Sequence, residues 1–142
     1  FYLVETAARG GGVYTSSHLL SYACDFDATQ LIIELCMGEK RDIETIKYAT
    51  KAVRYISFYI EQGEIKSIDG VDKIKKMSGV LDFYHRDLSV GDRYQGLADK
   101  SSRLGPILLG CEGLDEIERT TEKIRDTLIV RTEDCENAVV WD

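Results

Sequence analysis

The sequence has few of the residues that define a metal or disulfide scaffold. Its 142 residues include one proline and four cysteines. The cysteines are spread singly, with no Cys-x-x-Cys pair and no histidine nearby at metal-ligand spacing. Isolated cysteines of this kind predict independent thiols in a reducing compartment. We therefore expect no zinc site.

Long apolar runs and clusters of basic residues are also missing. No stretch approaches the roughly 20 apolar residues of a membrane span, and no leader-like segment precedes a cleavage site. The 25 acidic residues outnumber the 18 Lys and Arg, for a net charge of -7. That balance argues against nucleic acid or an anionic membrane as the partner. We expect a cytoplasmic protein.

The residues that are present predict a globular chain, with 44% hydrophobic and 30% charged side chains. The length suits one domain, or one domain and the edge of another. The sequence opens on an apolar residue of a predicted strand and has no initiator Met. We therefore expect it to be the C-terminal part of a larger protein.

The residues that are typical of a catalytic or ligand-binding site are concentrated in the first dozen positions. Phe1–Val4 reads as a short buried strand, and it is followed by Glu5, Arg9 and the glycines Gly10–Gly12. A carboxylate is a hard oxygen ligand for magnesium, and an arginine presents a planar fork to phosphate oxygens. Glycines let backbone N–H groups approach an anion. The alternative is an ordinary strand-end salt bridge between Glu5 and Arg9 beside a glycine turn.

The order Glu5-x-Ala7-x-Arg9-x-Gly11-Gly12 resembles the last catalytic motif of the ATP-grasp ligases, in its amino-acid-ligase and carbamoyl-phosphate-synthase-like branch. The resemblance implies that Glu5 binds magnesium and that Arg9 is catalytic, contacting the transferred phosphoryl group. It also implies that Arg9 and Gly10–Gly12 bind the ATP phosphates. Ala7 stands where the superfamily commonly has Asn, which removes one ligand.

The same resemblance implies an ATP- and magnesium-dependent ligase that joins a small-molecule carboxylate to an amine through an acyl phosphate. The rest of the ATP-grasp enzyme would lie upstream and would carry the remaining nucleotide-binding parts. We expect this chain alone to be inactive. A homodimer is left open.

Two helices are expected next. The first covers 13–24, with a cap at Ser16 or Ser17 and His18 in its first turn as a candidate contact to the cofactor. The second opens with the capping box of 27–30 and ends at Gly38. Its expected buried face comprises Leu31, Ile32, Leu35 and Cys36.

Beyond residue 50 the hydrophobic period changes from helical to alternating. The pattern predicts strand 52–60, its hairpin partner 64–68, an amphipathic stretch 71–77, strand 79–85, a turn at 90–93, strand 104–111, helix 115–128 and an edge strand at 129–131. The expected apolar stripe of the last helix comprises Leu114, Ile117, Thr121, Ile124 and Leu128. The acidic tail is expected to fray unless Trp141 docks.

This second region resembles the domain that follows the ATP-grasp lobe in ligases of the amino-acid-ligase and biotin-carboxylase type. The overall expectation is an α+β fold. A strand and two helices end an ATP-grasp C-lobe (1–48), a small antiparallel sheet with a C-terminal packing helix follows (49–132), and an acidic tail closes the chain (133–142).

The sequence allows three other interpretations. Lys75-Lys76-Met77 has some likeness to the modified lysine of a biotin or lipoyl carrier, but Val71, Ile74 and Met77 fit one apolar helical face better. His85 is a candidate for acid–base chemistry, although a solvated strand end is more common. A noncatalytic interaction or assembly domain is the rival function.

Overall fold

The computed structural model describes residues 14–40, 51–85, 88–97 and 102–142. The chain divides into two compact units, residues 1–50 and 51–142. Across the described residues the fold is α+β, as the sequence predicts. The predicted strand 1–4 lies outside them. Among the helices that are described, none combines the length and hydrophobicity that a membrane crossing requires.

The first described element of the first unit is a π-helical turn, η1 (Thr15–Leu19), which continues as α1 (Leu20–Cys24). The helix predicted for this segment is therefore confirmed, but its predicted cap is wrong. The helix starts after Tyr14, whose side chain makes no capping hydrogen bond, and both Ser16 and Ser17 lie inside η1. A serine can cap only when it precedes the first helical residue.

The second predicted helix is confirmed as α2 (Ala28–Cys36). Asp27 caps it, because its Oδ1 accepts a hydrogen bond from the backbone N–H of Gln30 at 2.9 Å. Gln30 does not complete the capping box, since its amide donates to Glu34 Oε1 instead. Gly38, with φ of +85°, follows the helix end as expected.

The predicted buried face of α2 is wrong. Ile32 is 52% exposed and Leu35 is 40% exposed, and Cys36 is also exposed. Between residues 14 and 40 the buried hydrophobic residues are Leu19, Ala23 and Ala28. Helical spacing identifies an apolar face, but burial also needs a neighbouring element to cover it.

The second unit is built on a sheet whose strand order is β3-β5-β1-β7. Its strands are β1 (Ala52–Ile60), β3 (Val80–Phe83), β5 (Leu104–Cys111) and β7 (Val139–Trp141), and all neighbours are antiparallel. Another sheet has the order β4-β2-β6, with β2 (Gly63–Asp69), β4 (Arg93–Tyr94) and β6 (Ile129–Thr132).

The predicted hairpin between 52–60 and 64–68 is wrong, although both strands form. β1 pairs with β5 and β7, whereas β2 pairs with β4 and β6, so consecutive strands lie in different sheets. A backbone hydrogen bond joins the β1–β2 connection to the β6–β7 connection. Glu61 N donates to Ala138 O at 2.9 Å, and Ala138 N donates to Val130 O at 2.8 Å.

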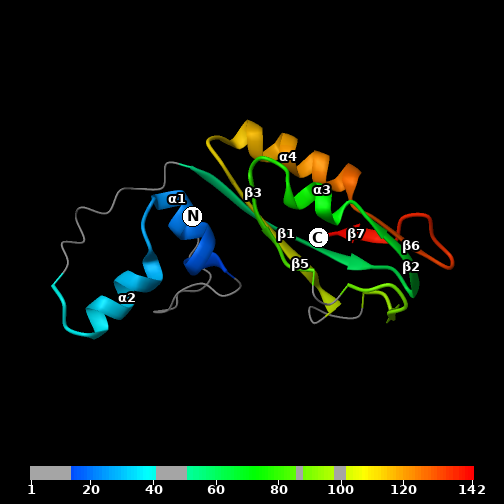
Figure 1. Ribbon diagram of the computed structural model, residues 1–142, viewed down its shortest axis with the longest axis horizontal. Coiled ribbons are helices and arrows are strands. Elements are labelled where there is room, and N and C mark those ends of the chain that lie inside the picture. Colours follow the sequence, from blue (N-terminus) through cyan, green and yellow to red (C-terminus); the bar gives the residue numbers. More distant parts are fainter. Residues whose placement is uncertain (1–13, 41–50, 86–87, 98–101) are drawn as a thin grey trace, which may run out of the picture. The chain divides into compact units, whose positions relative to one another are not determined.

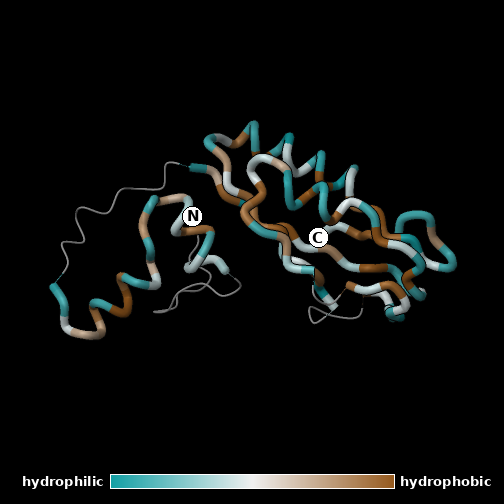
Figure 2. The backbone as a smooth tube through the Cα atoms, viewed as in Figure 1, coloured by the Kyte–Doolittle hydropathy of each residue, from teal (hydrophilic) through white to brown (hydrophobic). Residues whose placement is uncertain are grey.

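Helices α3 (Val71–Lys75) and α4 (Leu114–Thr127) lie side by side over the strands (Figure 1). Along α4, hydrophobic and hydrophilic residues alternate with the helical period (Figure 2). Four predicted stripe residues are buried: Ile117, Thr121, Ile124 and Leu128. Leu114 is the exception, with 73% of its surface exposed, because it starts the helix before the first turn reaches the core.

The C-terminal segment docks on the main sheet. β7 pairs with the end of β1, where Trp141 lies opposite Phe58 and Val139 lies opposite Ile60. The rings of Phe58 and Trp141 have centroids 5.6 Å apart. Since Phe58 is completely buried, this contact anchors the tail to the hydrophobic core.

Candidate functional site

Most of the predicted catalytic residues lie outside the described residues. This applies to Glu5, to Arg9 and to the glycines Gly10–Gly12, whose roles stay predictions. His18 is described, and it lies exposed on η1 with its Nδ1 2.7 Å from Ser17 Oγ. Its ring meets Tyr14 edge-on at 5.2 Å. The role of His18 as a cofactor contact also stays a prediction.

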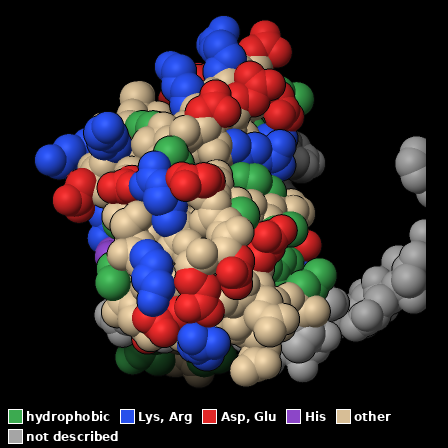
Figure 3. Space-filling model, turned by 90° about the vertical axis from the view of Figure 1, so that its right-hand side faces the viewer, with side chains coloured by type: hydrophobic (Ala, Val, Ile, Leu, Met, Phe, Trp, Pro, Cys, Tyr) green, Lys and Arg blue, Asp and Glu red, His purple; other side chains and the backbone are tan. Residues whose placement is uncertain are grey.

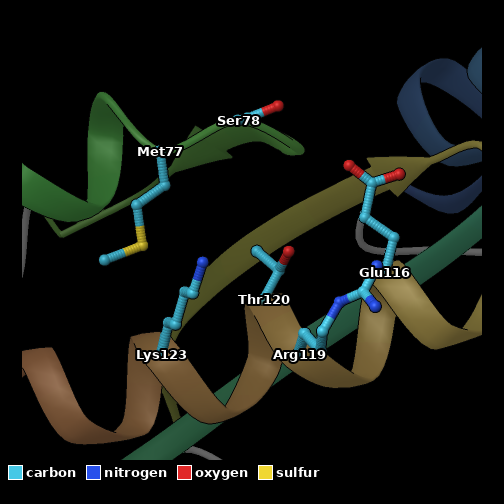
Figure 4. Close-up of a pocket in the computed structure, with 6 residues that line it drawn as sticks. All are labelled: Met77, Ser78, Glu116, Arg119, Thr120 and Lys123. Carbon is cyan, nitrogen blue, oxygen red and sulfur yellow. The ribbon is translucent and has the colours of Figure 1, made fainter.

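A cavity in the second unit brings together side chains that could bind a small ligand. It has a volume of about 250 Å³ and opens between α4 and the turn that joins α3 to β3 (Figure 4). We call it the α4 pocket. Its lining residues are Met77, Ser78, Glu116, Arg119, Thr120 and Lys123.

The wall of the pocket opposite α4 depends on Gly79. Its φ is +85°, and its carbonyl oxygen accepts a hydrogen bond from Gly110 N at 2.9 Å. A Cβ atom at Gly79 would lie 2.6 Å from Cys111 Sγ. Only glycine therefore lets the turn bearing Met77 and Ser78 approach β5 this closely.

The floor beside Gly79 is buried. Thr120 is 7% exposed and Cys111 is 2% exposed. Burial raises the pKa of the Cys111 thiol, and the negative charge of Glu116 adds to that effect, while a hydrogen bond with Thr120 opposes it. Cys111 is therefore an inert structural thiol rather than a nucleophile.

The pocket contains both signs of charge on one helix. Glu116, Arg119, Thr120 and Lys123 recur at spacings of three and four residues, so they share a face of α4. Glu116 Oε2 accepts a long hydrogen bond, 3.3 Å, from Glu112 N. No ion pair within the described residues involves Arg119 or Lys123.

Such a set can hold a small polar molecule by charge and hydrogen bonding. Its lining includes no histidine and no activated nucleophile, and the arrangement suits binding. The sequence analysis missed this pocket. The signal was the mixed-charge stripe of α4, but nothing in the sequence placed the Met77–Ser78 turn opposite it.

Elsewhere on the second unit, cations and carboxylates neutralise one another. The end that carries β2 and β6 shows acidic and basic side chains intermixed (Figure 3). Arg131 Nη1 lies 2.5 Å from Asp69 Oδ2, and Arg93 Nη2 lies 3.4 Å from Glu64 Oε2. Exposed pairs of this kind contribute little to stability.

Metal ligands do not converge in the parts of the chain that are described. Residues 14–40, 51–85, 88–97 and 102–142 contain no group of three or more His, Cys, Asp or Glu arranged to hold a metal ion. In the lysine pair considered for a carrier, Lys75 ends α3 and Lys76 is the C-cap of that helix, where Ile74 is completely buried. His85 Nδ1 lies 3.2 Å from the carbonyl oxygen of Phe83.

Comparison with known proteins gave one family match. Residues 45–133 match the model described as L-amino acid ligase C-terminal domain 2. The matched range includes all of α3 and α4 and therefore the whole α4 pocket. No curated protein and no solved structure matched the chain.

Proposed function

Because the chain belongs to the L-amino acid ligase C-terminal domain 2 family, we propose that it is the C-terminal part of an ATP-dependent carboxylate–amine ligase. The family domain is associated with ATP-grasp enzymes, which agrees with the resemblance of both sequence regions. The match over 45–133 is the observation that carries the proposal.

The family description makes two amino acids the expected substrates. In the proposed reaction, a carboxylate oxygen of the first attacks the γ-phosphorus of ATP, and ADP leaves. The amine nitrogen of the second then attacks the carbonyl carbon of the acyl phosphate. Phosphate leaves, the nitrogen loses a proton, and an amide bond remains.

The first twelve residues are proposed to contribute the phosphate side of that site. Arg9 is suited to orient phosphate oxygens, because its guanidinium can donate two parallel hydrogen bonds. The N–H groups of Gly10–Gly12 add donors without side-chain obstruction. Glu5 is the proposed ligand of Mg²⁺, which when bound supplies neutralisation of the phosphate charge. Ala7 has no ligand atom to add.

The test uses the complete gene product that contains this chain, with Glu5→Gln and Arg9→Lys variants. We expect each variant to lower ATP-dependent amide formation at least 100-fold, the scale seen when a positioned charge is removed from an active site. Hydroxylamine added to the wild type should trap the acyl phosphate as a hydroxamate. Glu122→Gln is the matched control, because it removes one exposed carboxylate outside the proposed motif. Unchanged turnover in Glu5→Gln would contradict the assignment.

One observation favours the rival function, a noncatalytic assembly domain. Ile33 is 54% exposed and Met37 is 75% exposed on or just after α2, and such apolar surface suits association. On this alternative the complete gene product makes no amide with any pair of amino acids. Its oligomeric state would then change in the Ile33→Asp variant.

A further inference from the structure

We propose that the α4 pocket binds a free α-amino acid in its zwitterionic form, at a place separate from the proposed ligase chemistry of Glu5 and Arg9. The inference goes beyond the proposed function, since it concerns the second unit alone. It rests on the size of the pocket, on its charges and on the packing that holds its walls.

The size of the pocket selects a small ligand. Its volume of about 250 Å³ lies just below the range of about 300–1,000 Å³ that is usual for drug-sized molecules. That volume accommodates an amino acid. A nucleotide would extend well outside it.

The charges of the pocket match an ammonium and a carboxylate together. The Glu116 carboxylate and the Lys123 ammonium reach toward the space from two ends of it, and the Thr120 hydroxyl lies between them (Figure 4). Glu116 suits the ligand's ammonium group. Arg119 and Lys123 suit its carboxylate, because a guanidinium and an ammonium both bind carboxylate oxygens.

A simple anion or cation would fit the pocket less well. Glu116 would repel phosphate, and the two cations would repel a basic ligand, since like charges nearby are unfavourable. A zwitterion avoids both penalties. The Met77 thioether, on the side opposite α4, offers a polarizable apolar surface to the ligand's side chain.

The walls are fixed before the ligand arrives. The close packing of Gly79 on Cys111 positions one side, and the burial of Thr120 positions the other. Binding therefore needs only the outer side chains to order, which limits its entropic cost.

The first experiment titrates the 142-residue chain with L-leucine and follows its methionine methyl groups by NMR. The chain has two methionines, and the other one, Met37, lies in the first unit and is 75% exposed. We expect a saturable shift of the Met77 signal and a fixed Met37 signal, with the assignment made by Met77→Leu. Failure of the Met77 signal to move, or equal movement of both, would overturn the proposal.

The second experiment compares three ligands by calorimetry. Leucinamide lacks the carboxylate, and N-acetyl-L-leucine lacks the ammonium group. We expect both to bind the wild type at least about tenfold more weakly than L-leucine, since each loses a charge-assisted contact. Inorganic phosphate that displaces L-leucine at equal concentration would show a plain anion site and refute the proposal.

Variants of the pocket residues test which side chain contacts the ligand's ammonium group and which contact its carboxylate. In Glu116→Gln, N-acetyl-L-leucine should bind as tightly as L-leucine. In the double variant Arg119→Gln with Lys123→Gln, leucinamide should bind as tightly as L-leucine. Glu122→Gln and Arg125→Gln, exposed on the same helix but outside the pocket, should change neither. Equal losses in the control variants would refute the assignment.

One further variant keeps this proposal separate from the proposed function. Glu5→Gln should leave leucine binding by the 142-residue chain intact, whether or not it abolishes ligase turnover. Loss of leucine binding in Glu5→Gln would move the ligand to the first unit and overturn the α4 pocket assignment.

Discussion

The guanidinium of Arg54 holds the carboxylate of Glu118 through both terminal nitrogens. Nη1 lies 2.9 Å from Oε2, and Nη2 bonds to Oε1. Nη1 also donates to Thr121 Oγ1 at 3.0 Å. The paired residues are 64 positions apart, on β1 and α4. This contact ties β1 to α4, the helix that carries four of the α4 pocket residues.

The first prediction concerns acid sensitivity. The hydrogen bond from Arg54 lowers the pKa of the Glu118 carboxyl below its usual value. A lowered folded-state pKa stabilises the fold above the unfolded-state pKa, about 4.3 for Glu, and this stabilisation is lost as the pH falls through the folded value. We expect Glu118→Gln to lower Tm at pH 7 and to reduce the fall in Tm below about pH 4.3. Melting curves across pH 3 to 7 measure this effect.

Glu122→Gln is the control for that experiment, because it removes one negative charge from the same helix without touching Arg54. In Glu122→Gln, Tm should fall at acidic pH as steeply as it does in the wild type. A Glu118→Gln profile that falls as steeply as the wild type would show that the Arg54 contact does not stabilise the fold.

The second prediction separates steric clash from backbone strain at glycine. Gly70 and Gly91 have nearly equal φ values, +95° and +92°. A Cβ at Gly70 would lie 2.1 Å from the carbonyl oxygen of Thr127, whereas nothing lies within 4 Å at Gly91. Gly91→Ala should lower the free energy of unfolding by about 1–2 kcal/mol, because alanine is strained in the left-handed conformation. Gly70→Ala should cost roughly 1–3 kcal/mol more, from overpacking.

Urea unfolding followed by circular dichroism measures both glycine variants. Comparable losses at the two positions would mean that Gly70 does not pack against the end of α4.

The third prediction concerns the docked tail. Trp141→Ala removes the ring that packs on Phe58 and should lower the unfolding free energy by about 1–3 kcal/mol, the scale of a partly buried aromatic contact. Val140→Ala is the matched control, since Val140 is 39% exposed on the same strand. Its effect should stay below about 1 kcal/mol. Chemical denaturation of both variants measures the difference, and a Trp141→Ala variant as stable as the control would place β7 outside the cooperative core.

The fourth prediction concerns cysteine labelling. Cys36 is exposed, whereas Cys111 is 2% exposed and burial raises the pKa of its thiol. Because the thiolate is the reactive form, iodoacetamide at pH 8 should alkylate Cys36 first and leave Cys111 unmodified until the chain unfolds. Peptide mass spectrometry after timed quenching measures each rate. Equal rates under native conditions would show that β5 is not covered at Cys111.

Local patterns in the sequence were sufficient for most elements. Alternating hydrophobicity identified β1 and β3, and three-to-four spacing identified α2 and most of the buried face of α4. Asp27 was recognised as a cap because its hydrogen bond to Gln30 closes within four residues. The family resemblance of the second region also followed from residue order, and the match over 45–133 confirms it.

The predicted pairing of β1 with β2 failed because a short turn between two strands does not decide which edge each strand takes. β1 obtains both neighbours, β5 and β7, from residues far along the chain. The prediction that α2 buries its apolar face failed for a related reason. The sequence shows the apolar face at Ile32 and Leu35, but it does not show whether another element packs against that face.

The sequence by itself determined where most of the described helices and strands form and which family its second region belongs to, because backbone propensity and hydrophobic period act over a few residues. Only the tertiary structure decided which strands are neighbours, and that the turn at Met77 faces Glu116 and Lys123 to form a pocket. Those relationships depend on packing between segments distant in the chain, where steric fit and burial select one arrangement among several that the local pattern allows.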